Sequence, residues 1–488
     1  MTIYDFVTVD PMQVFETSVP HNGLAMLNAA WKELGKTVRT IDYAKREYPL
    51  DRHVRLAGKT SHFGVTVKTV TYARSQEITR AFDRKAKDLG VRADTKILWG
   101  GAHVTDRMET DDPTLRGLPW VFDDTSKAAK ERLLAENPEV DIFVPGEAEY
   151  WPDHVSRRTS LDDLPFPDYS DFDSFENIQD GWRRGHLVWP IVTSRGCPYL
   201  CSFCEVQRVS GRAWRHRSVE NCMDEISSMW KLHRFRQFEV VDDEFNIGRK
   251  KGVAPEHAKS FCQGIIQLKA DDKVPKDLPW RCPNGLRADF YDAEFNDLLL
   301  ESGCGQVSFG VESLEPSVFK RVTKGETVEE IEATLRLCVE RKMPFFGHTI
   351  VGLPDSTFEK DLVTLNKLMD ITEGGTKGFG TFSILQVMEG TQIAAIAQRE
   401  GYRDPKIMDN AFFGEHLEVG YWTEEYGRDE RMDAFLIFNY AIGNGRTPEY
   451  YKSWKAEDAR VDLLRRIEKH KDRLRAGLDP RWHGRLGI

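Results

Sequence analysis

Cysteine is missing from most of this 488-residue chain, because none of its eight cysteines lies before Cys197 or after Cys338. Long hydrophobic runs are missing as well. No stretch of about 18 apolar residues occurs, and residues 1–10 contain neither a basic segment nor a continuous apolar one. These absences argue against a membrane span and predict a cytoplasmic protein with reduced thiols. The cysteines therefore mark one chemically special region.

An excess of positive charge is also absent. The chain has 68 Lys and Arg against 78 Asp and Glu, and its net charge of −10 argues against non-specific nucleic-acid binding by the chain as a whole. No fixed-period repeat or low-complexity tract occurs, which excludes a solenoid. The length by itself predicts roughly three domains.

Residues 1–150 alternate between β-like and helical segments, which predicts a doubly wound parallel sheet covered on both faces. The β-like runs are Thr37–Tyr43, Phe63–Val70, Lys96–Gly100 and Val140–Val144, and the helical stretches are Gly23–Gly35 and Ser75–Leu89. Residues 151–185 are rich in Asp, Pro and Ser with little periodicity, and we predict that they form a connector.

Residues 186–395 alternate more regularly, and six strand-helix units in series predict a partial (β/α)6 parallel barrel. The expected strands are Leu187–Ser194, Phe238–Asp243, Pro279–Leu286, Gln306–Glu312, Phe345–Val351 and Thr381–Val387. The expected helices are Val219–His233, Pro255–Leu268, Tyr291–Ser302, Thr327–Arg341 and Thr357–Met369. In such barrels the chemistry gathers at the carboxyl ends of the strands.

Residues 396–488 are predicted to form a mainly helical C-terminal region that ends in a helix over Glu457–Arg475. The basic residues of this helix leave an RNA-modifying enzyme open as a hypothesis. Its interspersed acidic residues favour the solvated face of a packed helix instead.

The strongest chemical signal is Cys197, Cys201 and Cys204, which follow the first predicted barrel strand at spacings of four and three residues. Thiolates this close together select a soft metal centre, and one short loop can hold three corners of an iron–sulfur cubane. No fourth ligand is nearby, so one iron would stay open for a ligand other than a side chain. The alternative is a structural zinc site completed by His216, within a scaffold protein that is not an enzyme.

The three cysteines, with Phe203 directly before the last, resemble the CxxxCxxC signature of the radical S-adenosylmethionine (radical SAM) enzymes. In that family three cysteines hold a [4Fe-4S] cluster, and its open iron binds the amino and carboxylate groups of SAM. An electron from the cluster cleaves SAM to a 5′-deoxyadenosyl radical. The resemblance implies that the three cysteines bind the cluster and that Phe203 contacts the cofactors.

Further motifs of the family follow in order at predicted strand ends, namely Val241–Phe245, Asn284–Asp289 and Ser308–Ser313. The residues that the resemblance implies for SAM binding are Asp242, Asp243, Glu244, Arg287, Glu312 and Ser313. The first three would meet the SAM amino group, Arg287 would bind the carboxylate as a fork, and the last two would hold ribose hydroxyls or the methionyl amine. Singly, such acidic residues are more often helix caps, but their order favours radical SAM chemistry.

The amino-terminal segment resembles the cobalamin-binding domain that precedes the barrel in one branch of the family. The match rests on Pro20–Leu24, Leu98–Thr105 and Val144–Glu149. Gly100 and Gly101 would let the backbone approach a bulky ligand after a strand. The Asp-x-His-x-x-Gly loop that often ligates cobalt is absent, since His21 lies two residues from Gly23 rather than three. Cobalamin binding therefore stays open, the alternative being a sheet that only supports the barrel.

With cobalamin, the resemblance implies methylation of an unactivated carbon, with SAM used both as methyl donor and as radical source. Without it, a rearrangement, cyclisation or oxidation is the alternative. The expected partners are a small-molecule or peptide substrate and a reductant such as flavodoxin or ferredoxin, with nucleic acid disfavoured. Auxiliary clusters are not expected, because no cysteine precedes Cys197 or follows Cys338.

The substrate cannot be read from a motif, and no catalytic residue is identified. His348, Gln386 and Glu389 lie near predicted strand ends and are candidates for substrate contact, although a core histidine and surface polar groups are the simpler interpretation.

Cys282 and Cys304 are most simply core residues, with a radical relay as the alternative. Lys324–Thr327 is interpreted as a capped helix start, and Gly347–Pro354 resembles the family's fifth strand and its turn.

Overall fold

The structure, a computed structural model, describes residues 3–11, 21–42, 54–68, 71–108, 124–146, 160–249, 251–388, 391–400, 419–442 and 456–488. The chain divides into two compact units. The first comprises Met1–Pro198, Glu205–Glu239 and Leu268–Leu278, and the second comprises Tyr199–Cys204, Val240–Gln267 and Pro279–Ile488. Among the described residues, no helix is both long and apolar enough to cross a membrane.

The first unit contains a five-stranded sheet. Its strands are β1 (Tyr4–Asp10), β2 (Val38–Asp42), β3 (Thr60–Thr66), β4 (Lys96–Gly100) and β5 (Ile142–Val144), in the order β2-β1-β3-β4-β5. Neighbouring strands pair in parallel. The strand order reverses between β1 and β3, which is the pattern of a doubly wound sheet, and ligands bind such sheets at the carboxyl ends of the strands beside this reversal.

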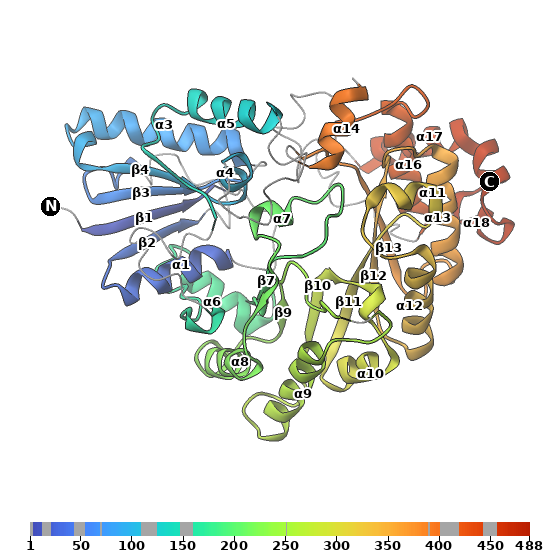
Figure 1. Cartoon of the computed structure of the whole chain (residues 1–488), viewed down its shortest axis with the longest axis horizontal. Helices are drawn as coiled ribbons and strands as arrows, with labels where there is room; N and C mark the ends of the chain where they lie inside the picture. The colour runs from blue at the N-terminus through green and yellow to red at the C-terminus, as the bar shows by residue number, and fades with distance from the viewer. Residues whose placement is uncertain are drawn as a thin grey trace. The chain divides into compact units, whose positions relative to one another are not determined.

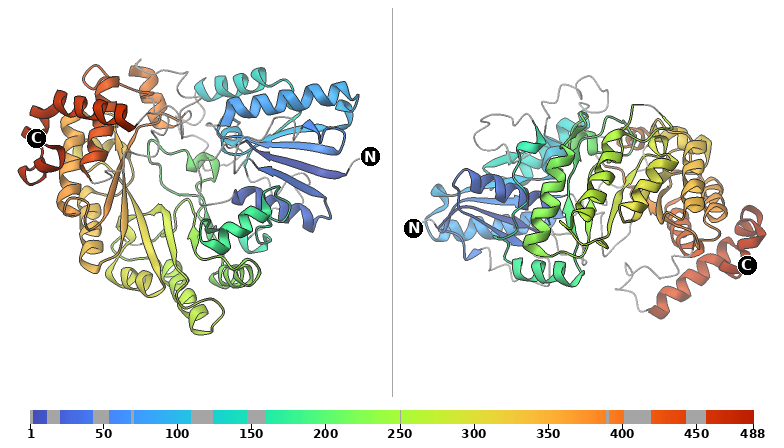
Figure 2. Two further views of the ribbon diagram at one scale, coloured as in Figure 1. Left: turned by 180° about the vertical axis from the view of Figure 1, so that it is seen from behind. Right: turned by 90° about the horizontal axis from the view of Figure 1, so that it is seen from below.

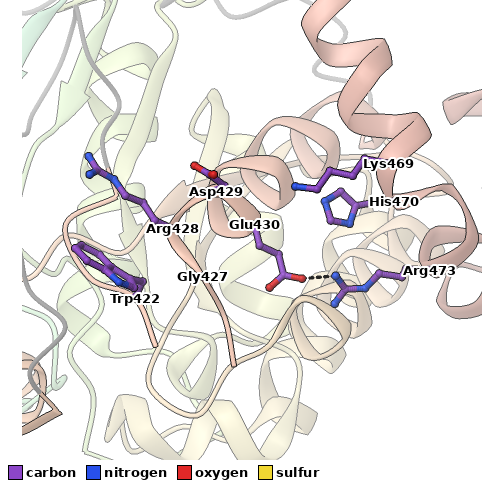
Figure 3. Close-up of a pocket in the computed structure, with 8 residues that line it drawn as sticks. All are labelled: Trp422, Gly427, Arg428, Asp429, Glu430, Lys469, His470 and Arg473. Atoms are coloured by element: carbon purple, nitrogen blue, oxygen red, sulfur yellow. Dashed lines mark hydrogen bonds and ion pairs between the residues drawn. The ribbon is translucent and has the colours of Figure 1, made fainter. Parts of the chain in front are cut away.

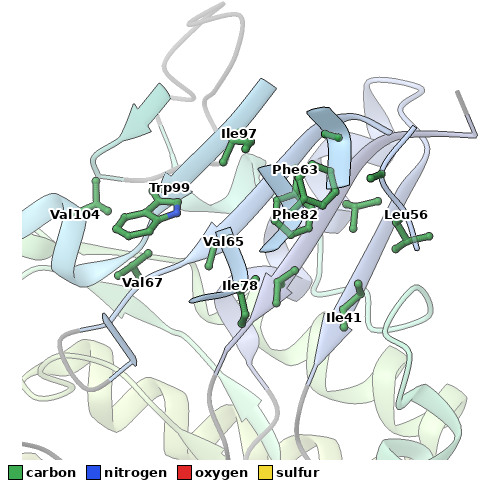
Figure 4. Packing of buried hydrophobic residues seen from close by; sticks show 14 of the residues in the cluster. Ile41, Leu56, Phe63, Val65, Val67, Ile78, Phe82, Ile97, Trp99 and Val104 are labelled. Atoms are coloured by element: carbon green, nitrogen blue, oxygen red, sulfur yellow. The ribbon is translucent and has the colours of Figure 1, made fainter. Parts of the chain in front are cut away.

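Helices cover both faces of this sheet, with α1 (Asn22–Glu33) on one face and α3 (Tyr72–Asp88) on the other (Figure 1). The helices α4 (Ala102–Arg107) and α5 (Asp124–Glu136) follow β4. The core between sheet and helix includes Phe63 stacked on Phe82 at 3.8 Å between ring centroids (Figure 4). Trp99 is fully buried, and its Nε1 donates to Thr79 Oγ1 at 2.8 Å, so its one polar atom is satisfied.

The sequence prediction for this unit needs two corrections. It omitted β1, the central strand, because Asp5, Thr8 and Asp10 interrupt its apolar pattern. The connector is also more structured than predicted, since it contains α6 (Phe175–Arg184) with buried Trp182. Before α6 the connector pairs with β2, because Thr40 N–H donates to Asp171 O and Asp173 N–H donates to Thr40 O, both at 2.9 Å. This pairing covers the outer edge of β2.

The second sheet has six strands, namely β6 (Trp189–Ile191), β9 (Phe238–Val240), β10 (Trp280–Leu286), β11 (Cys304–Glu312), β12 (Phe345–Val351) and β13 (Phe379–Ile384). Their order is β13-β12-β11-β10-β9-β6. Each strand lies beside the strand that precedes it in the chain, as a partial barrel requires. The predicted fold class is therefore confirmed. A short antiparallel pair, β7 (Ser194–Arg195) and β8 (Arg215–His216), flanks α7 (Val206–Val209) after β6.

Helices connect these strands, namely α8 (Val219–His233), α9 (Glu256–Ala270), α10 (Ala293–Glu301), α12 (Val328–Arg341) and α13 (Phe358–Ile371). The short elements η5 (Ala288–Phe290), α11 (Pro316–Phe319) and η6 (Lys320–Val322) lie in the connecting loops. The helices α10, α12 and α13 lie along one face of the strands β10–β13 (Figures 1 and 2). The side chains of β12 alternate accordingly, with Phe345 and Val351 buried and Phe346, His348 and Ile350 half-buried. The half-buried side chains face away from the helices and form the inner wall of the barrel.

The described part of the C-terminal region is mainly helical, as predicted. It contains α14 (Gln392–Glu400), α16 (Arg428–Ala441), α17 (Ala456–Gly477) and α18 (His483–Leu486). Asn439 on α16 is bonded to the last strand through its side-chain amide. Its Oδ1 accepts from Phe382 N–H and its Nδ2 donates to Phe382 O, both at 2.9 Å. The amide thus occupies backbone groups of β13 that a further strand would otherwise bind.

Candidate functional site

The cysteine loop begins directly after β7. Gly196 has a positive φ of 87°, and a Cβ atom at this position would clash with the carbonyl oxygen of Ala213. Only glycine therefore lets the two segments approach this closely. The next residue, Cys197, donates its N–H to Gly211 O at 3.1 Å. This close backbone packing fixes where the first of the three cysteines emerges.

The remaining two cysteines lie in a loop of the second unit. Cys204 N–H donates to Cys201 O at 3.0 Å, which closes a tight turn. Between them, Ser202 N–H donates to Val322 O at 2.8 Å and Ser202 Oγ donates to Arg321 O at 2.7 Å. A further bond runs from Thr323 Oγ1 to Leu200 O at 2.8 Å. The loop that carries Cys201 and Cys204 is thus attached to residues 321–323, which end the connection after β11.

The three motif cysteines differ from the other five in exposure. Cys197, Cys201 and Cys204 are half-buried, whereas Cys222, Cys262, Cys282, Cys304 and Cys338 are buried. Burial raises the pKa of the thiol of Cys304 and of Cys338 to about 12, so these two thiols stay protonated in the core. The half-buried cysteines are therefore the ones available to a [4Fe-4S] cluster.

The zinc alternative finds no support in the part of the chain that is described. No three His, Cys, Asp or Glu side chains there lie close enough to hold one metal ion. Ligands of a single zinc ion must converge on one point, whereas each cysteine of a cubane binds its own iron. His216 lies on β8, and its Nδ1 is 3.1 Å from the carbonyl oxygen of Arg217.

The predicted acidic residues follow β9. Asp242 is buried, and its carbonyl oxygen accepts a hydrogen bond from Asn284 Nδ2 at 3.1 Å, which ties this loop to β10. Asp243 and Glu244 are half-buried. Burial of the Glu244 carboxyl raises its pKa to about 8, although the nearby cations Arg287 and Lys324 act in the opposite direction. At neutral pH this carboxyl is protonated unless a further cation comes close.

Arg287 is placed differently from the sequence prediction. Its Nε and Nη2 donate to the two carboxylate oxygens of Asp289 at 2.9 Å, and its Nη1 donates to Lys324 O at 3.1 Å. The guanidinium lies over the ring of Tyr199, with 3.4 Å between its carbon atom and the ring centroid. Because the fork is occupied by Asp289, the structure argues against Arg287 as the fork that binds the SAM carboxylate.

Glu312 ends β11 in a strained conformation. Its φ is 57°, a value that residues other than glycine rarely adopt, and the pairing with β12 shifts register between Gly310 and Glu312. Such strain is typical of functional sites. Ser313, by contrast, is fully buried, with its Oγ 3.2 Å from Thr364 Oγ1. The hydroxyl of Ser313 thus faces α13, and the structure argues against its predicted contact with SAM.

Lys324 and Glu326 complete the site, although the sequence pattern of Lys324–Thr327 indicates only a helix start. Thr327 does cap α12. The Lys324 Nζ, however, is buried against Gly310 O, Glu312 Oε1 at 3.3 Å and Glu326 Oε2 at 3.0 Å. Burial lowers the pKa of Lys324, but Glu326 and Glu312 more than offset this effect, so its pKa is raised. The sequence did offer one signal for this role. Lys324 lies at the end of the loop that follows the strand-end acid Glu312.

We call Glu244, Arg287, Asp289, Glu312, Lys324 and Glu326 the strand-end cluster. All six lie in the second unit, and four carboxyl groups there meet two cations. A buried group with this surplus of carboxyls is complementary to a ligand that carries positive charge. SAM carries both an ammonium and a sulfonium, so the residues present fit SAM.

The inner wall of the barrel lies beside this cluster. His348 on β12 pairs in register with Gly310 on β11 and with Thr381 on β13. Burial lowers the pKa of His348, which keeps its imidazole neutral, and the carbonyl oxygen of Pro283 is its hydrogen-bond partner. The contact of His348 with a substrate stays a prediction. Gln386 is half-buried after β13, and Glu389 lies outside the described residues.

The predicted cobalamin residues lie at the carboxyl edge of the first sheet. Gly100 ends β4, and Gly101 has a φ of 99°, where a Cβ atom would lie 2.9 Å from Thr66 Oγ1 and from Val67 O. His21 caps α1, since its Nδ1 accepts from Leu24 N–H at 3.1 Å. The imidazole of His21 therefore carries its hydrogen on Nε2, which is buried and has no partner among the described residues. A buried N–H without an acceptor at this edge fits a ligand that has hydrogen-bond acceptors, such as cobalamin. Because Nε2 carries this hydrogen, the arrangement does not fit ligation of cobalt by His21.

A separate cleft of about 710 Å³ lies in the C-terminal region (Figure 3). It is lined by Trp422, Gly427, Arg428, Asp429, Glu430, Lys469, His470 and Arg473. Several of its charges are paired, because Arg473 contacts Glu430 and Glu359, and Lys469 contacts Asp433 at 2.8 Å. None of the predicted site residues lines this cleft, so we do not regard it as the active site.

The fold and the site define a class of enzyme. In this class a parallel partial barrel carries a cysteine loop after its first strand and charged groups at its strand ends. The sequence profile of the Radical SAM superfamily matches residues 191–368. This match covers most of the barrel and includes the cysteine loop, so this part of the chain is a radical SAM domain. Among curated relatives, the cytidylyl-2-hydroxyethylphosphonate methyltransferase of Streptomyces wedmorensis is 24% identical over 328 residues, which cover 65% of this chain and 58% of that protein. Compared with three such relatives, the chain spans between 46% and 62% of their length.

Two solved structures share the fold over most of the chain. The radical SAM methyltransferase TsrM from Kitasatospora setae, with cobalamin and a [4Fe-4S] cluster bound, has a TM-score of 0.59 and 21% identity, covering 83% of this chain and 80% of TsrM. The cobalamin-dependent SAM radical enzyme OxsB, with aqua-cobalamin and SAM bound, has a TM-score of 0.62 and 16% identity, covering 96% of this chain and 71% of OxsB. At these identities the matches show the fold.

Proposed function

We propose that this protein is a cobalamin-dependent radical SAM methyltransferase that methylates an unactivated carbon of a small-molecule or peptide substrate. One observation carries the proposal. The loop with Cys201 and Cys204 is hydrogen-bonded to residues 321–323, directly before Lys324 of the strand-end cluster. A metal-binding loop and a cluster suited to a cationic ligand are thereby held together at the carboxyl ends of the strands, where barrel enzymes carry out their chemistry.

Further observations support the two other parts of the proposal, cobalamin binding and methylation. A five-stranded doubly wound sheet precedes the barrel in the same chain, and two proteins of the same fold hold cobalamin. The curated relative described above is named a methyltransferase. The buried Nε2–H of His21, at the edge of that sheet, offers a hydrogen bond to the bound corrin.

The chain's own residues have distinct tasks in this proposal. Cys197, Cys201 and Cys204 hold the cluster, and the carboxylates of the strand-end cluster orient the cationic head of SAM. Along the inner wall, Phe346 and His348 contact the substrate and keep water away from the reacting carbon. When bound, the [4Fe-4S] cluster supplies the electron that cleaves SAM, and cobalamin carries the methyl group that is transferred.

The test is an anaerobic reconstitution of the full chain with iron, sulfide and hydroxocobalamin, followed by desalting and by quantification of bound iron and cobalamin. SAM and a reductant are then added, and the products are identified. We expect bound cobalamin together with 5′-deoxyadenosine and S-adenosylhomocysteine. Deoxyadenosine alone without retained cobalamin would contradict the methyltransferase and favour a rearrangement, cyclisation or oxidation.

A pair of variants separates catalysis from a structural role of the cysteines. Cys201→Ala is expected to lose SAM cleavage and about a quarter or more of the bound iron, while its far-UV circular dichroism stays that of the parent. Cys222→Ala, which changes a buried cysteine of α8, is the matched control and should keep both iron and activity. Intact SAM cleavage in Cys201→Ala would overturn the proposal.

The cluster also needs an electron donor, and we propose that an acidic protein reductant such as flavodoxin or ferredoxin fills this role. Replacing dithionite by reduced flavodoxin in the same assay should sustain more than one turnover of SAM per chain. Activity with dithionite but with neither protein reductant would contradict this assignment while leaving the reaction itself intact.

A further inference from the structure

The carbonyl oxygen of Ser202 ties the cysteine loop to a second element, the helix α14. Ser202 lies between Cys201 and Cys204 and is only 2% exposed. Its N–H and Oγ are bonded to the carbonyl oxygens of residues 322 and 321, and its own carbonyl oxygen accepts from Ile393 N–H at 3.0 Å. All three polar groups of this buried residue therefore have a partner, two in the connection after β11 and one in α14.

The N–H of Ile393 is free to make this bond because of its place in α14. The helix begins at Gln392, and Thr391 caps it, since Thr391 Oγ1 accepts from Ala394 N–H at 3.2 Å. The first N–H groups of a helix have no partner within the helix, and the N–H of Ile393 is one of them. Ser202 O thus gives a buried donor of α14 the acceptor that it needs.

The start of α14 is itself held in place. Thr391 is 1% exposed, and its Oγ1 also donates to Met388 O at 2.7 Å. The side chains of Ile393 and Ala397 are fully buried, so the helix is packed into the second unit. A donor that is fixed in this way restrains the loop to which it is bonded.

This second attachment lies outside the part of the chain that matches the superfamily profile, which ends at residue 368. The first attachment, through residues 321–323, lies within it. α14 follows β13, the last strand of the barrel, whereas the cysteine loop follows the first strands. The bond between Ile393 and Ser202 therefore joins the C-terminal region to the loop that carries the cysteines.

We propose that α14 is a positioning element for the [4Fe-4S] cluster and that its Ile393 N–H acts through Ser202. Because Ser202 is held by two elements, the turn from Cys201 to Cys204 keeps one geometry, and the two thiolates stay at a fixed separation. Groups behind the ligands of a metal site orient those ligands in this way. This inference rests on the proposed function, because it requires that the cysteines bind the cluster.

Two helix caps provide a test. Thr391→Ala removes the cap of α14, so that its first turn frays and the Ile393 N–H loses its fixed position. Thr357→Ala is the matched control, because Thr357 caps α13 of the same unit by the same kind of bond, accepting from Lys360 N–H at 3.3 Å.

The readout for the caps is the rate at which a chelator removes iron from the anaerobically reconstituted full chain, at a temperature where every variant is folded. We expect this rate to rise about fivefold or more in Thr391→Ala and to change less than about twofold in Thr357→Ala. Thermal unfolding of both variants shows whether the two caps cost similar stability. Equal rates of iron loss in the two variants would overturn the proposal.

A second pair of variants removes the donor itself. Ile393→Pro lacks the N–H, and proline is tolerated in the first turn of a helix. Ile393→Val keeps the N–H and controls for the changed side chain. We expect Ile393→Pro to lose iron about fivefold faster than Ile393→Val and to shift the electron paramagnetic resonance spectrum of the reduced cluster. The same rate and spectrum in both would overturn the proposal, and this pair stays informative if Thr391→Ala does not fold.

The two proposals fail in distinguishable ways. If the wild-type chain retains no iron after reconstitution, the proposed function fails. If it holds a [4Fe-4S] cluster but the two members of each pair lose iron equally fast, only the positioning role of α14 fails.

Discussion

At the scale of single residues, Glu244 links the site to pH. The unfolded chain ionises this carboxyl near the ordinary pKa of 4.5, whereas burial keeps it protonated in the folded protein up to about pH 8. The folded state therefore binds more protons than the unfolded state between these values, and this group makes the free energy of unfolding fall as pH rises through that range. Glutamine at this position stays neutral throughout.

We expect Glu244→Gln to become more stable relative to the parent as pH rises. The gain should be at least about 1 kcal/mol between about pH 5 and about pH 8, because the carboxyl of the parent ionises in the unfolded chain but stays protonated in the folded one, which stabilises the unfolded state. Urea unfolding of the cluster-free protein at several pH values measures it. A stability difference that stays constant over this range would mean that the carboxyl is not buried as described.

A second residue-scale prediction concerns Gly196. In Gly196→Ala the new methyl group clashes with Ala213 O and the residue must keep a positive φ, so the position of Cys197 shifts. Reconstituted iron should fall by about half or more. Gly252→Ala is the matched control, because Gly252 has a φ of 74° but an open space around its Cβ position. Equal iron contents in the two variants would count against close packing at Gly196.

At the scale of elements, one edge of each sheet is covered by groups distant in sequence. The connector pairs with β2 through Thr40, Asp171 and Asp173, and the Asn439 side chain bonds to β13. Uncovered edge strands invite pairing with other chains, so these bonds protect the fold as well as stabilise it. The connector is therefore bonded to the edge of the first sheet and is not a simple linker.

Removing the Asn439 amide should release the edge of β13. Asn439→Leu leaves Phe382 N–H and C=O without partners, and we expect a loss of about 1–3 kcal/mol in the free energy of unfolding, measured by chemical denaturation. Asn439→Asp still accepts from Phe382 N–H, but it buries an unpaired carboxylate beside Phe382 O, so its loss at neutral pH should be larger. The same loss in both variants would contradict this account.

At the scale of the whole molecule, the proposed function assigns cobalamin to the first sheet and the [4Fe-4S] cluster to the cysteine loop. Gly101→Val introduces a side chain that Thr66 and Val67 leave no room for, and it should lower cobalamin retention without lowering bound iron. Cys201→Ala should do the reverse. Anaerobic reconstitution followed by metal analysis and absorption spectroscopy measures both quantities. Parallel loss of iron and cobalamin in each variant would mean that the sites are not independent.

The sequence by itself determined the alternation of elements, the partial barrel and the cysteine loop. These features are local, since strand and helix periods, the spacing of Cys197, Cys201 and Cys204, and the cap at Thr327 all lie within short windows of the chain. The strand β12 matches its predicted bounds for this reason. The central strand β1 was missed because polar residues interrupt its local pattern.

Only the tertiary structure decided which charged groups meet. Arg287 could have bound a ligand carboxylate, but folding pairs it with Asp289, and the hydroxyl of Ser313 turns toward Thr364 on α13. Lys324 reaches Glu312 only because the loop after β11 folds back over the end of that strand. Side-chain type and spacing say which groups can form an ion pair. The partner that each buried charge finds depends on three-dimensional packing, because a buried ion must be paired by whatever the fold brings within reach.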